Sequence, residues 1–343
     1  MDKKEKLIYI GNALAVHNVT PTSADIMPGL FREEGYDVLV FSSKRSLLLR
    51  MLDMLGGIVC YARSTDVVLI DTYSTKNFWY AFFCARLCQL LPLKYIPILH
   101  GGSLPQRMDR SPHMTKAILA NAHAIVTPSR YLQEEIEQRG YESALIPNTI
   151  PVAEYRFKER RVLRPRLFFV RAFAGLYNPQ MALYVLKALL KDYPEAELCM
   201  VGPDKDGTLN DCKTLAKDLG IEKKVMFPGR LSKAEWHKLS EEYDVFINTT
   251  NKDNTPVSVI EAMALGLPVV STNPGGVSYL IDDGKDGLLV DCDDVNTMVK
   301  QINRLLKRDE KALSIARVAR TKAEGFDWEC VKERWESLLS GKE

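Results

Sequence analysis

The sequence predicts an α/β protein with two parallel sheets, each covered by helices on both faces. Short apolar runs alternate with helical stretches along the chain, which is the pattern of strand–helix–strand units. The segment 151–166 interrupts this alternation with charged residues and a proline near each end, as linkers between domains do. The chain has 343 residues and is 46% hydrophobic, enough for two cores. We therefore expect domains at 1–155 and 166–322, followed by a helical segment at 323–343.

The elements of the first domain follow from apolar runs bounded by polar or glycine-containing turns. We expect strands at 7–10, 37–41, 67–71, 94–99, 124–127 and 143–146. We expect helices at 23–34, 116–121 and 129–139, among others. Ligands of such sheets bind at the carboxyl ends of the strands, so residues that directly follow a strand are the first candidates for a site.

The second domain repeats the same alternation. We expect strands at 167–170, 197–201, 224–227, 245–249, 268–271 and 287–290. We expect helices at 179–192, 208–219, 233–243, 258–265 and 295–308. The chain then ends in two helical pieces around Gly325, the last of which carries two tryptophans.

The stretch 253–270 predicts a loop, a buried helix, a tight turn and a strand. Thr255 offers a hydroxyl cap, and Pro256 suits the first helical position because its missing N–H costs nothing there. Gly266 is a natural helix stop. Two carboxylates, Asp253 and Glu261, lie within this apolar unit, and a buried carboxylate needs a partner.

This helix start suits a ligand that carries phosphate. The first turn, Thr255 to Ser258 with Pro256 and Val257 between them, would point its N–H groups at whatever lies in front of it. Together with the two carboxylates, it predicts a site for a polyhydroxyl ligand bearing phosphate, such as a nucleotide sugar. An alternative remains open at this point: Glu261 pairs with a nearby Lys or Arg and binds nothing.

The same stretch resembles the donor-binding signature of the family four retaining glycosyltransferases, also called glycosyl transferases group 1. That signature has an acidic residue, seven intervening residues, and Glu in Glu-Ala-Met-Ala-x-Gly-x-Pro-Val-Val, followed by a Gly-Gly turn. Here 261–270 carries the second part, and Gly275 and Gly276 form the turn. The resemblance continues through 227–230, 243–248 and 283–290, and it is strong from Pro165 onward. It implies the GT-B fold, two Rossmann-like doubly wound domains facing a cleft.

The resemblance implies roles for the two carboxylates and one cation of the second domain. Glu261 matches the family's Glu that holds the ribose hydroxyls of the nucleotide. Asp253 stands where the family usually has Glu, and matches the acid that contacts the donor sugar. Arg171 matches the Arg that stabilises the leaving diphosphate. The Lys that the family has five or six residues later is absent, and Arg230 or Lys252 is a candidate substitute.

Two further candidates belong to the first domain. His100 ends the strand at 94–99, precedes Gly101 and Gly102, and matches the family's His near the donor sugar. Gly11 follows the first strand, where the family usually has a Gly-Gly run lining the phosphate side of the site. The catalytic set implied is thus His100, Arg171 and Asp253, with Glu261, Gly11, Arg230 and the helix start as donor-binding residues.

The resemblance implies a retaining, metal-independent hexosyltransferase that acts in cell-surface polysaccharide or glycolipid synthesis. The expected partners are a nucleotide sugar and a glycan or lipid-linked acceptor. Members of this family need no metal, so the resemblance implies that no cofactor is required. A GT-B phosphorylase is disfavoured because no pyridoxal-binding lysine motif is evident. The missing Lys and the Asp-for-Glu change leave a catalytically impaired nucleotide-sugar-binding homologue as the alternative.

Composition restricts the partners and the compartment. A net charge of +2 does not favour nucleic-acid binding. The seven cysteines lack zinc spacing, and Cys84 and Cys88 suit packed thiols in a reduced compartment. The charged start of the chain leads into an apolar run too short for a secretory signal. We therefore expect a cytoplasmic protein, at the inner face of the membrane if the acceptor is lipid-linked.

Two stretches of the first domain bear on membrane contact. The stretch 44–55 is basic at its start and apolar after it, and 74–91 is rich in aromatic residues. Either both lie in an anionic membrane interface, or both are ordinary buried helices. The first alternative predicts lipid contact through basic and apolar side chains: Lys44, Arg45, Arg50, Leu47, Leu48, Met51 and Leu55.

Overall fold

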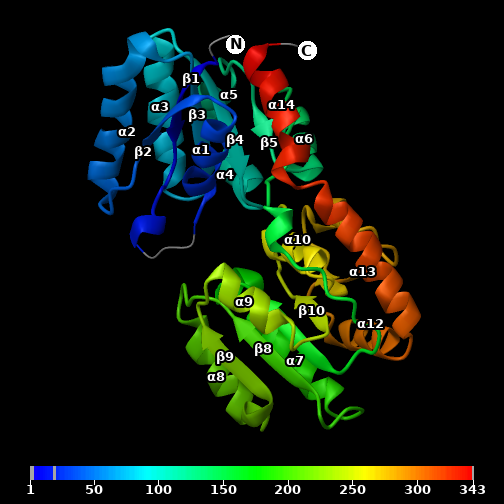
Figure 1. Cartoon of the computed structure of the whole chain (residues 1–343). Coiled ribbons are helices and arrows are strands. Elements are labelled where there is room, and N and C mark those ends of the chain that lie inside the picture. Colours follow the sequence, from blue (N-terminus) through cyan, green and yellow to red (C-terminus); the bar gives the residue numbers. More distant parts are fainter. Residues whose placement is uncertain (1–3, 18–20, 342–343) are drawn as a thin grey trace. The chain divides into compact units, whose positions relative to one another are not determined.

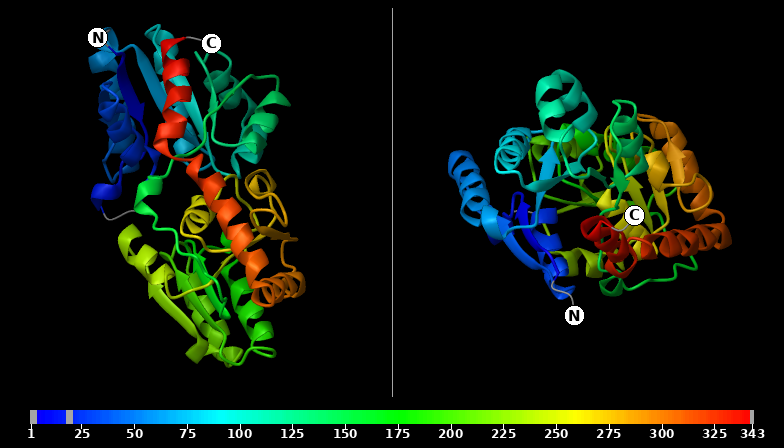
Figure 2. Two further views of the ribbon diagram at one scale, coloured as in Figure 1. Left: turned by 45° about the vertical axis from the view of Figure 1, so that its right-hand side comes forward. Right: turned by 90° about the horizontal axis from the view of Figure 1, so that it is seen from above.

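The computed structural model describes residues 4–17 and 21–341, and the chain divides into two compact units (Figure 1). Unit 1 comprises Met1–Asn148 and Val331–Glu343, and unit 2 comprises Thr149–Cys330. Each unit contains one six-stranded parallel sheet with helices on both faces, as the further views also show (Figure 2). The α/β fold with two parallel sheets predicted from the sequence is confirmed.

The sheet of unit 1 has the strand order β2-β1-β3-β4-β5-β6. Its strands are β1 Lys6–Ile10, β2 Asp37–Phe41, β3 Val67–Tyr73, β4 Lys94–His100, β5 Val126–Thr127 and β6 Ala144–Leu145. Its helices are α1 Ser23–Glu33, α2 Leu47–Tyr61, α3 Asn77–Leu90, α4 Leu104–Arg110, α5 Pro112–Leu119 and α6 Arg130–Glu137. The predicted strands of the first domain are all present, although the last two are shorter than expected.

The sheet of unit 2 has the strand order β12-β11-β10-β7-β8-β9. Its strands are β7 Arg166–Val170, β8 Glu197–Val201, β9 Val225–Gly229, β10 Val245–Asn248, β11 Val269–Thr272 and β12 Leu288–Val290. Its helices are α7 Pro179–Leu189, α8 Thr208–Asp218, α9 Lys233–Ser240, α10 Val257–Ala264, α11 Val277–Leu280, α12 Val295–Leu306 and α13 Asp309–Glu324. The four-residue helix α11 was not among the predicted elements.

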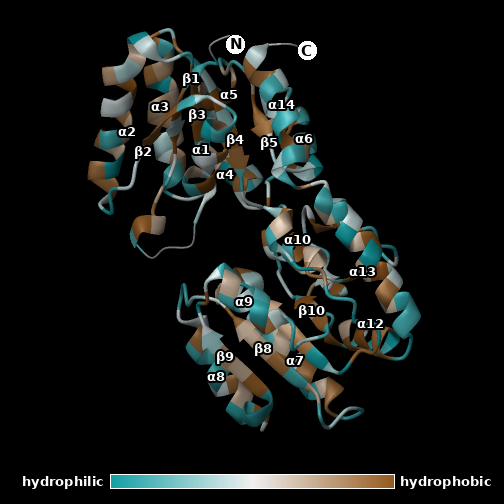
Figure 3. Ribbon diagram, in the orientation of Figure 1, coloured by the Kyte–Doolittle hydropathy of each residue, from teal (hydrophilic) through white to brown (hydrophobic). Residues whose placement is uncertain are grey.

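Each sheet carries an apolar core on its covered faces. In unit 1, buried residues of β1 and β3 pack against buried residues of α2 and α3. Cys84 and Cys88 of α3 belong to this core as free thiols. Unit 2 has two buried clusters, one of which includes α7 and α12 and the other α10 and α13. The hydropathy colouring shows the same pattern, with brown strands such as β4, β5 and β10 inside each unit (Figure 3).

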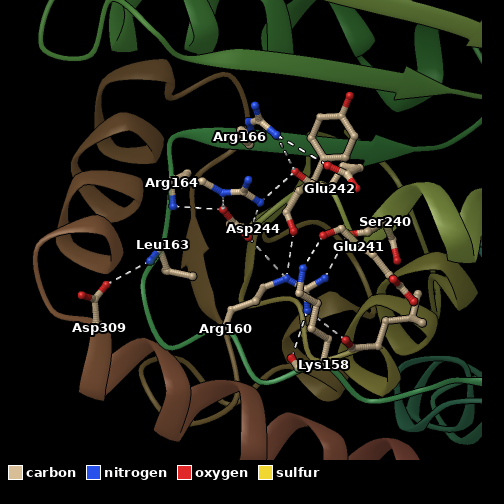
Figure 4. Close-up of polar contacts among 12 residues, drawn as sticks. Lys158, Arg160, Leu163, Arg164, Arg166, Ser240, Glu241, Glu242, Asp244 and Asp309 are labelled. Atoms are coloured by element: carbon tan, nitrogen blue, oxygen red, sulfur yellow. Dashed lines mark hydrogen bonds and ion pairs between the residues drawn. The ribbon is translucent and has the colours of Figure 1, made fainter.

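The segment 149–166 differs from the linker predicted, because it belongs to unit 2 and is fastened along it. Arg160 is buried and donates hydrogen bonds to the carbonyl oxygens of Tyr243, Leu265 and Ser240 at 2.8, 3.0 and 2.9 Å (Figure 4). Arg164 donates to Asp244 at 2.7 Å. The charges that suggest a solvated linker are therefore the groups that hold this segment in place.

The last helix, α14 Trp328–Ser340, lies beside the elements of unit 1 in both views of Figure 2. From Val331 onward it belongs to that unit. Trp335 packs edge-on against Phe31 of α1, with ring centroids 5.4 Å apart. Lys4 and Glu336 form an ion pair at 2.6 Å. The C-terminal segment thus helps to build the unit that begins the chain.

Candidate functional site

Arg171 and Asp253, two of the predicted catalytic residues, contact each other in unit 2. Arg171 directly follows β7, and its Nη2 forms an ion pair with Asp253 Oδ2. Its Nη1 lies 3.5 Å from the Oγ atom of Ser258, the second residue of α10. The guanidinium carbon lies 4.3 Å from the centre of the Tyr177 ring. Arg171 Nε is buried and has no hydrogen-bond partner within the described residues.

The loop before α10 is held by a close approach to the glycine turn after β11. A Cβ atom at Gly276 would lie 1.9 Å from Asn254 O, so only glycine fits there. The N–H of Gly276 also donates to Asp253 O at 3.1 Å. This contact explains why the Gly-Gly turn accompanies Asp253 in the sequence: the turn fixes the loop that carries the carboxylate.

The start of α10 differs by one residue from the prediction. The cap is Pro256, not Thr255, and no side-chain hydrogen bond caps the helix. The predicted hydroxyl cap at Thr255 is therefore wrong. Proline adopts the extended cap conformation without strain, with φ −68° and ψ 106°. The N–H groups of Val257 and Ser258 lie in the first turn, where an α-helix has no carbonyl partners for them.

Glu261 lies on α10, three residues after Ser258, and only 6% of it is exposed. Its Oε1 atom accepts a hydrogen bond from Tyr155 Oη at 2.7 Å and forms an ion pair with Lys233 Nζ at 2.9 Å. The prediction that this buried carboxylate has a partner is confirmed, and the partner includes a Lys, as the open alternative required. The Lys233 side chain is 42% exposed, so this ion pair lies at the edge of the solvent.

An aromatic side chain backs this carboxylate. The Tyr155 and His237 rings lie 4.3 Å apart. Burial, followed by the charge of Glu261, raises the pKa of Tyr155 far above its ordinary value, so its hydroxyl stays a donor. Burial also lowers the pKa of His237. Glu261 is thus held by the neutral hydroxyl of the buried Tyr155 and by the partly exposed cation of Lys233.

His100 lies in unit 1 at the end of β4 and is 7% exposed. Its Nε2 atom lies 2.9 Å from Asp71 Oδ1, and the ring of Tyr73 stacks on it with centroids 4.7 Å apart. Asp71 and Tyr73 both come from the adjacent strand β3. The histidine singled out by the sequence is therefore part of a buried polar cluster at the carboxyl ends of β3 and β4.

Gly11 and Arg230 have different surroundings. A Cβ atom at Gly11 would lie 2.6 Å from Asp71 Oδ2 and 2.5 Å from Ala24 Cβ. The Gly11 N–H donates to Phe41 O at 2.8 Å, so this amide is committed to the sheet edge. Arg230 is exposed and directly follows β9. Close packing is thus the structural reason for glycine at position 11.

Sequence reasoning missed Tyr155, Lys233 and Asp71. Tyr155 lies in the segment interpreted as a linker, and its partner is 106 residues away. Lys233 follows a serine cap in a helix that was predicted for other reasons. Asp71 offered a usable signal, because it is a carboxylate near the carboxyl end of an apolar strand, where the sites of parallel sheets form.

The surface of α2 and α3 differs in detail from the predicted membrane contact. Arg50 does not meet solvent: it is 5% exposed and donates to the carbonyl oxygens of Lys44 and Arg45 at 2.7 and 3.0 Å and to Asn12 Oδ1 at 3.1 Å. Its prediction as a lipid contact is wrong, because these acceptors satisfy its donors inside the unit. Met51 and Leu55 are half-buried. The exposed apolar side chains here include Leu47, Leu48, Leu49, Leu52, Trp79 and Phe83.

Membrane spans and metal sites can be judged for the described ranges 4–17 and 21–341. No helix there combines the length and apolar character needed to cross a bilayer. No group of three or more His, Cys, Asp or Glu side chains in these ranges is arranged to hold a metal ion.

Residues 152–322 match the family model of glycosyl transferases group 1. This matched range contains Arg171, Asp253 and Glu261. Through this half, the chain belongs to that family. An uncharacterized glycosyltransferase of Haemophilus influenzae is 29% identical over 211 residues, 60% of this chain and 57% of the relative. The D-inositol 3-phosphate glycosyltransferase of Corynebacterium jeikeium is 29% identical over 175 residues, 50% of this chain and 42% of the relative. The chain thus spans about half the length of these group 1 relatives.

Solved structures extend the likeness to both units. The crystal structure of Anabaena HepE in complex with UDP and glucose has a TM-score of 0.80 and 16% identity, and it covers 98% of this chain and 100% of HepE. At this identity, the likeness shows the fold alone. The family match and the structural match together place this group 1 member in the GT-B fold class.

Proposed function

We propose that this protein is a retaining glycosyltransferase that moves a sugar from a nucleotide-sugar donor to a hydroxyl group of an acceptor. The observation that carries the proposal is the arrangement around α10. Arg171, Asp253 and Ser258 meet at its start, and Glu261 follows one turn later. A cation beside a helix N-terminus suits phosphate, and a carboxylate suits vicinal hydroxyls.

Glu261 would hold the ribose of the donor nucleotide. A carboxylate accepts hydrogen bonds at both oxygens, and two hydroxyls can share it. Oε1 is already engaged by Tyr155 and Lys233. Because Lys233 is partly exposed, a ribose hydroxyl can replace its contact, whereas the buried Tyr155 stays and orients the carboxylate.

Arg171 would stabilise the diphosphate as it leaves. Its Nε donor has no partner, and its Nη2 donor is taken by Asp253. A planar guanidinium can bind a phosphate through two donors, and the N–H groups of Val257 and Ser258 would add to the same charge. Thr255 and Pro256 would set the start of this turn, and Arg230 would add charge at the end of β9. These groups supply the positive charge that a metal supplies elsewhere, so we propose a metal-independent reaction.

The contacts of Asp253 fit a retaining reaction that has no covalent enzyme intermediate. Its Oδ2 is ion-paired with Arg171, and its Oδ1 accepts from the N–H of Asn254 at 2.9 Å. A carboxylate held in this way is a poor nucleophile but a good acceptor for sugar hydroxyls. We therefore propose that the acceptor hydroxyl attacks from the face that the diphosphate leaves, and that His100 hydrogen-bonds a substrate hydroxyl.

The acceptor we propose is a glycan or a lipid-linked sugar of cell-surface polysaccharide or glycolipid synthesis, reached at the inner face of the membrane. The alternative function is a catalytically impaired nucleotide-sugar binder. One observation favours it: Tyr177 lies against Arg171 in the segment where the family has its Lys. A tyrosine ring orients the guanidinium but adds no charge.

Product formation separates these two functions. The protein is incubated with UDP-, GDP- and ADP-sugars, and release of the nucleoside diphosphate is followed with and without candidate acceptors and EDTA. We expect release from one nucleotide class, faster with acceptor and insensitive to EDTA. Binding of the same nucleotide without any release would favour the impaired homologue. Neither binding nor release with any donor would contradict both functions.

The membrane contact we propose uses α2 and α3 of unit 1. Leu48 and Leu52 of α2 are 69% and 57% exposed, and Trp79 of α3 is 47% exposed. The Tyr80 hydroxyl donates to Leu47 O at 3.2 Å, which holds the two helices together. Lys44 and Arg45 are exposed just before α2. Apolar side chains flanked by cations suit an anionic bilayer surface.

Sedimentation with vesicles tests this contact. We expect the protein to co-sediment with phosphatidylglycerol vesicles at low salt and to be released at high salt, because added ions screen exposed charges. The double variant Lys44→Glu, Arg45→Glu and the variant Leu48→Gln should both lose binding. Val162→Gln, an exposed position of unit 2, is the control. Equal sedimentation of the wild type and all three variants would rule out this surface of α2 and α3 as the membrane contact.

A further inference from the structure

We propose that Asp71 is a positioning residue that fixes His100 as the Nε2–H tautomer, so that its Nδ1 atom accepts a hydrogen bond from a substrate hydroxyl. The hydroxyl part of this inference rests on the proposed function. The tautomer part rests on unit 1 alone.

The contact between the two side chains is set by neighbouring strands. β3 and β4 are parallel, and Tyr73 pairs with His100 in their register. Asp71 lies two residues before Tyr73, so its side chain is on the same face of the sheet. Its Oδ1 atom lies 2.9 Å from His100 Nε2 and also accepts from Tyr9 Oη at 2.9 Å.

The chemistry of the acceptor decides the tautomer. A carboxylate accepts hydrogen bonds and donates none, so Nε2 must carry the proton in this pair. In the neutral ring, Nδ1 is then an acceptor. Nδ1 makes no hydrogen bond within the described residues and is not among the fully enclosed atoms. Its lone pair is therefore available to a ligand.

The surroundings keep Asp71 in this one arrangement. Asp71 is 4% exposed, and its Oδ2 atom has no hydrogen-bond partner in the described part of the chain. A Cβ atom at Gly11 would lie 2.6 Å from Oδ2, so the carboxylate fits only beside glycine. An unpartnered buried oxygen costs stability. Because this oxygen makes no compensating bond, the place of Asp71 beside a histidine at the carboxyl ends of parallel strands favours a role other than folding.

Two tyrosines restrict the pair further. The Tyr73 ring stacks on His100 at an interplanar angle of 19°, which fixes the plane of the imidazole. Burial, followed by the charge of Asp71, raises the pKa of Tyr9 well above its ordinary value, so its hydroxyl remains a donor to Asp71. Asp71 Oδ1 is thus in contact with both the Tyr9 hydroxyl and His100 Nε2.

Nitrogen NMR of histidine-labelled protein tests the tautomer without any substrate. The chain has five histidines, and the spectrum of His100→Gln identifies the signal of His100. In the wild type, at a pH where the ring is neutral, we expect the Nε2–H form. Asp71→Asn should shift the signal toward the Nδ1–H form, because an amide can donate to Nε2. Tyr9→Phe should keep the wild-type tautomer.

Kinetics then test the role toward substrate. Asp71→Asn should lower kcat by roughly 100-fold, with little change in the KM of the donor. Tyr9→Phe should lower kcat far less, although this variant also removes a hydrogen bond to Asp71 Oδ1. An Nδ1–H tautomer in the wild type would overturn the inference even if Asp71→Asn does not fold. So would equal kcat values for Asp71→Asn and wild type. A wild type that consumes no nucleotide sugar would sink the proposed function and leave the NMR result standing.

Discussion

Arg160 and Arg171 belong to the same unit, and both are largely buried, yet their surroundings differ. Every nitrogen of the Arg160 side chain donates to a carbonyl oxygen within 3.2 Å. Arg171 has an unpartnered Nε, an aromatic ring against its face and a single carboxylate partner. A cation whose donors all end on the backbone is part of the fold. A cation that is partly exposed at a helix start and has one carboxylate partner is available to a ligand.

The largest effect should come from removing Arg160. Arg160→Met would leave carbonyl oxygens of the chain segments around it without donors, and we expect unit 2 to lose about 3–5 kcal/mol of unfolding free energy. Urea unfolding followed by circular dichroism measures the loss. Arg161→Met is the matched control, because its side chain is 79% exposed, and it should change stability by less than about 0.5 kcal/mol. Similar urea midpoints for Arg160→Met and Arg161→Met would show that the buried arginine stabilises unit 2 no more than the exposed one.

Removing Arg171 should affect turnover instead. Arg171→Ala should lower kcat by roughly 10²–10³-fold, about 2.7–4 kcal/mol, because in the proposed reaction its charge acts on the leaving diphosphate. The affinity of Arg171→Ala for the free nucleoside diphosphate should fall by a smaller factor than kcat does. Steady-state kinetics and titration calorimetry separate the two quantities. Unchanged kcat would show that Arg230 or Lys252 supplies the charge, and Tyr177→Lys tests whether the family's missing cation is tolerated.

A smaller effect should come from Tyr155, which shares its segment with Arg160 but contacts Glu261. Tyr155→Phe removes one hydrogen bond to the carboxylate and should weaken nucleoside diphosphate binding by about 0.5–1.5 kcal/mol. Tyr184→Phe, an exposed tyrosine of the same unit, should leave the affinity unchanged. If both variants bind as the wild type does, Tyr155 does not position Glu261.

The smallest effect should be a pH dependence of stability that comes from His237. Burial lowers its pKa in the folded state, while Glu261 and Glu154 oppose this and Lys233 adds to it. The unfolded chain therefore takes up the proton first, and stability should fall as pH drops below about 6.5, the ordinary histidine pKa. His237→Phe should reduce that slope, measured by thermal unfolding between pH 8 and 5. An unchanged slope would assign the effect to other groups, such as His123, whose pKa burial also lowers.

The same contrast shows what the sequence could predict. The strands and Arg171 were predictable, because apolar runs mark the strands and a cation directly after one lies at the ligand-binding edge. The burial of Glu261 followed from its apolar neighbours. Arg160 was not predictable, because its carbonyl partners other than Lys158 O are 80 or more residues away. Arg50 misled for a different reason: two of its acceptors, Lys44 O and Arg45 O, are near it in the chain, but a buried arginine looks like a surface charge in sequence. The Asp71–His100 pair required the register of β3 and β4.

The most direct test of the proposed function is calorimetric titration of UDP, GDP and ADP into the wild type and Glu261→Ala. We expect one nucleoside diphosphate to bind the wild type, and the variant to lose about 1–3 kcal/mol of that affinity while remaining folded. Equal affinity for the folded variant, or no binding of any of the three to the wild type, would contradict the assignment of α10 as the donor site.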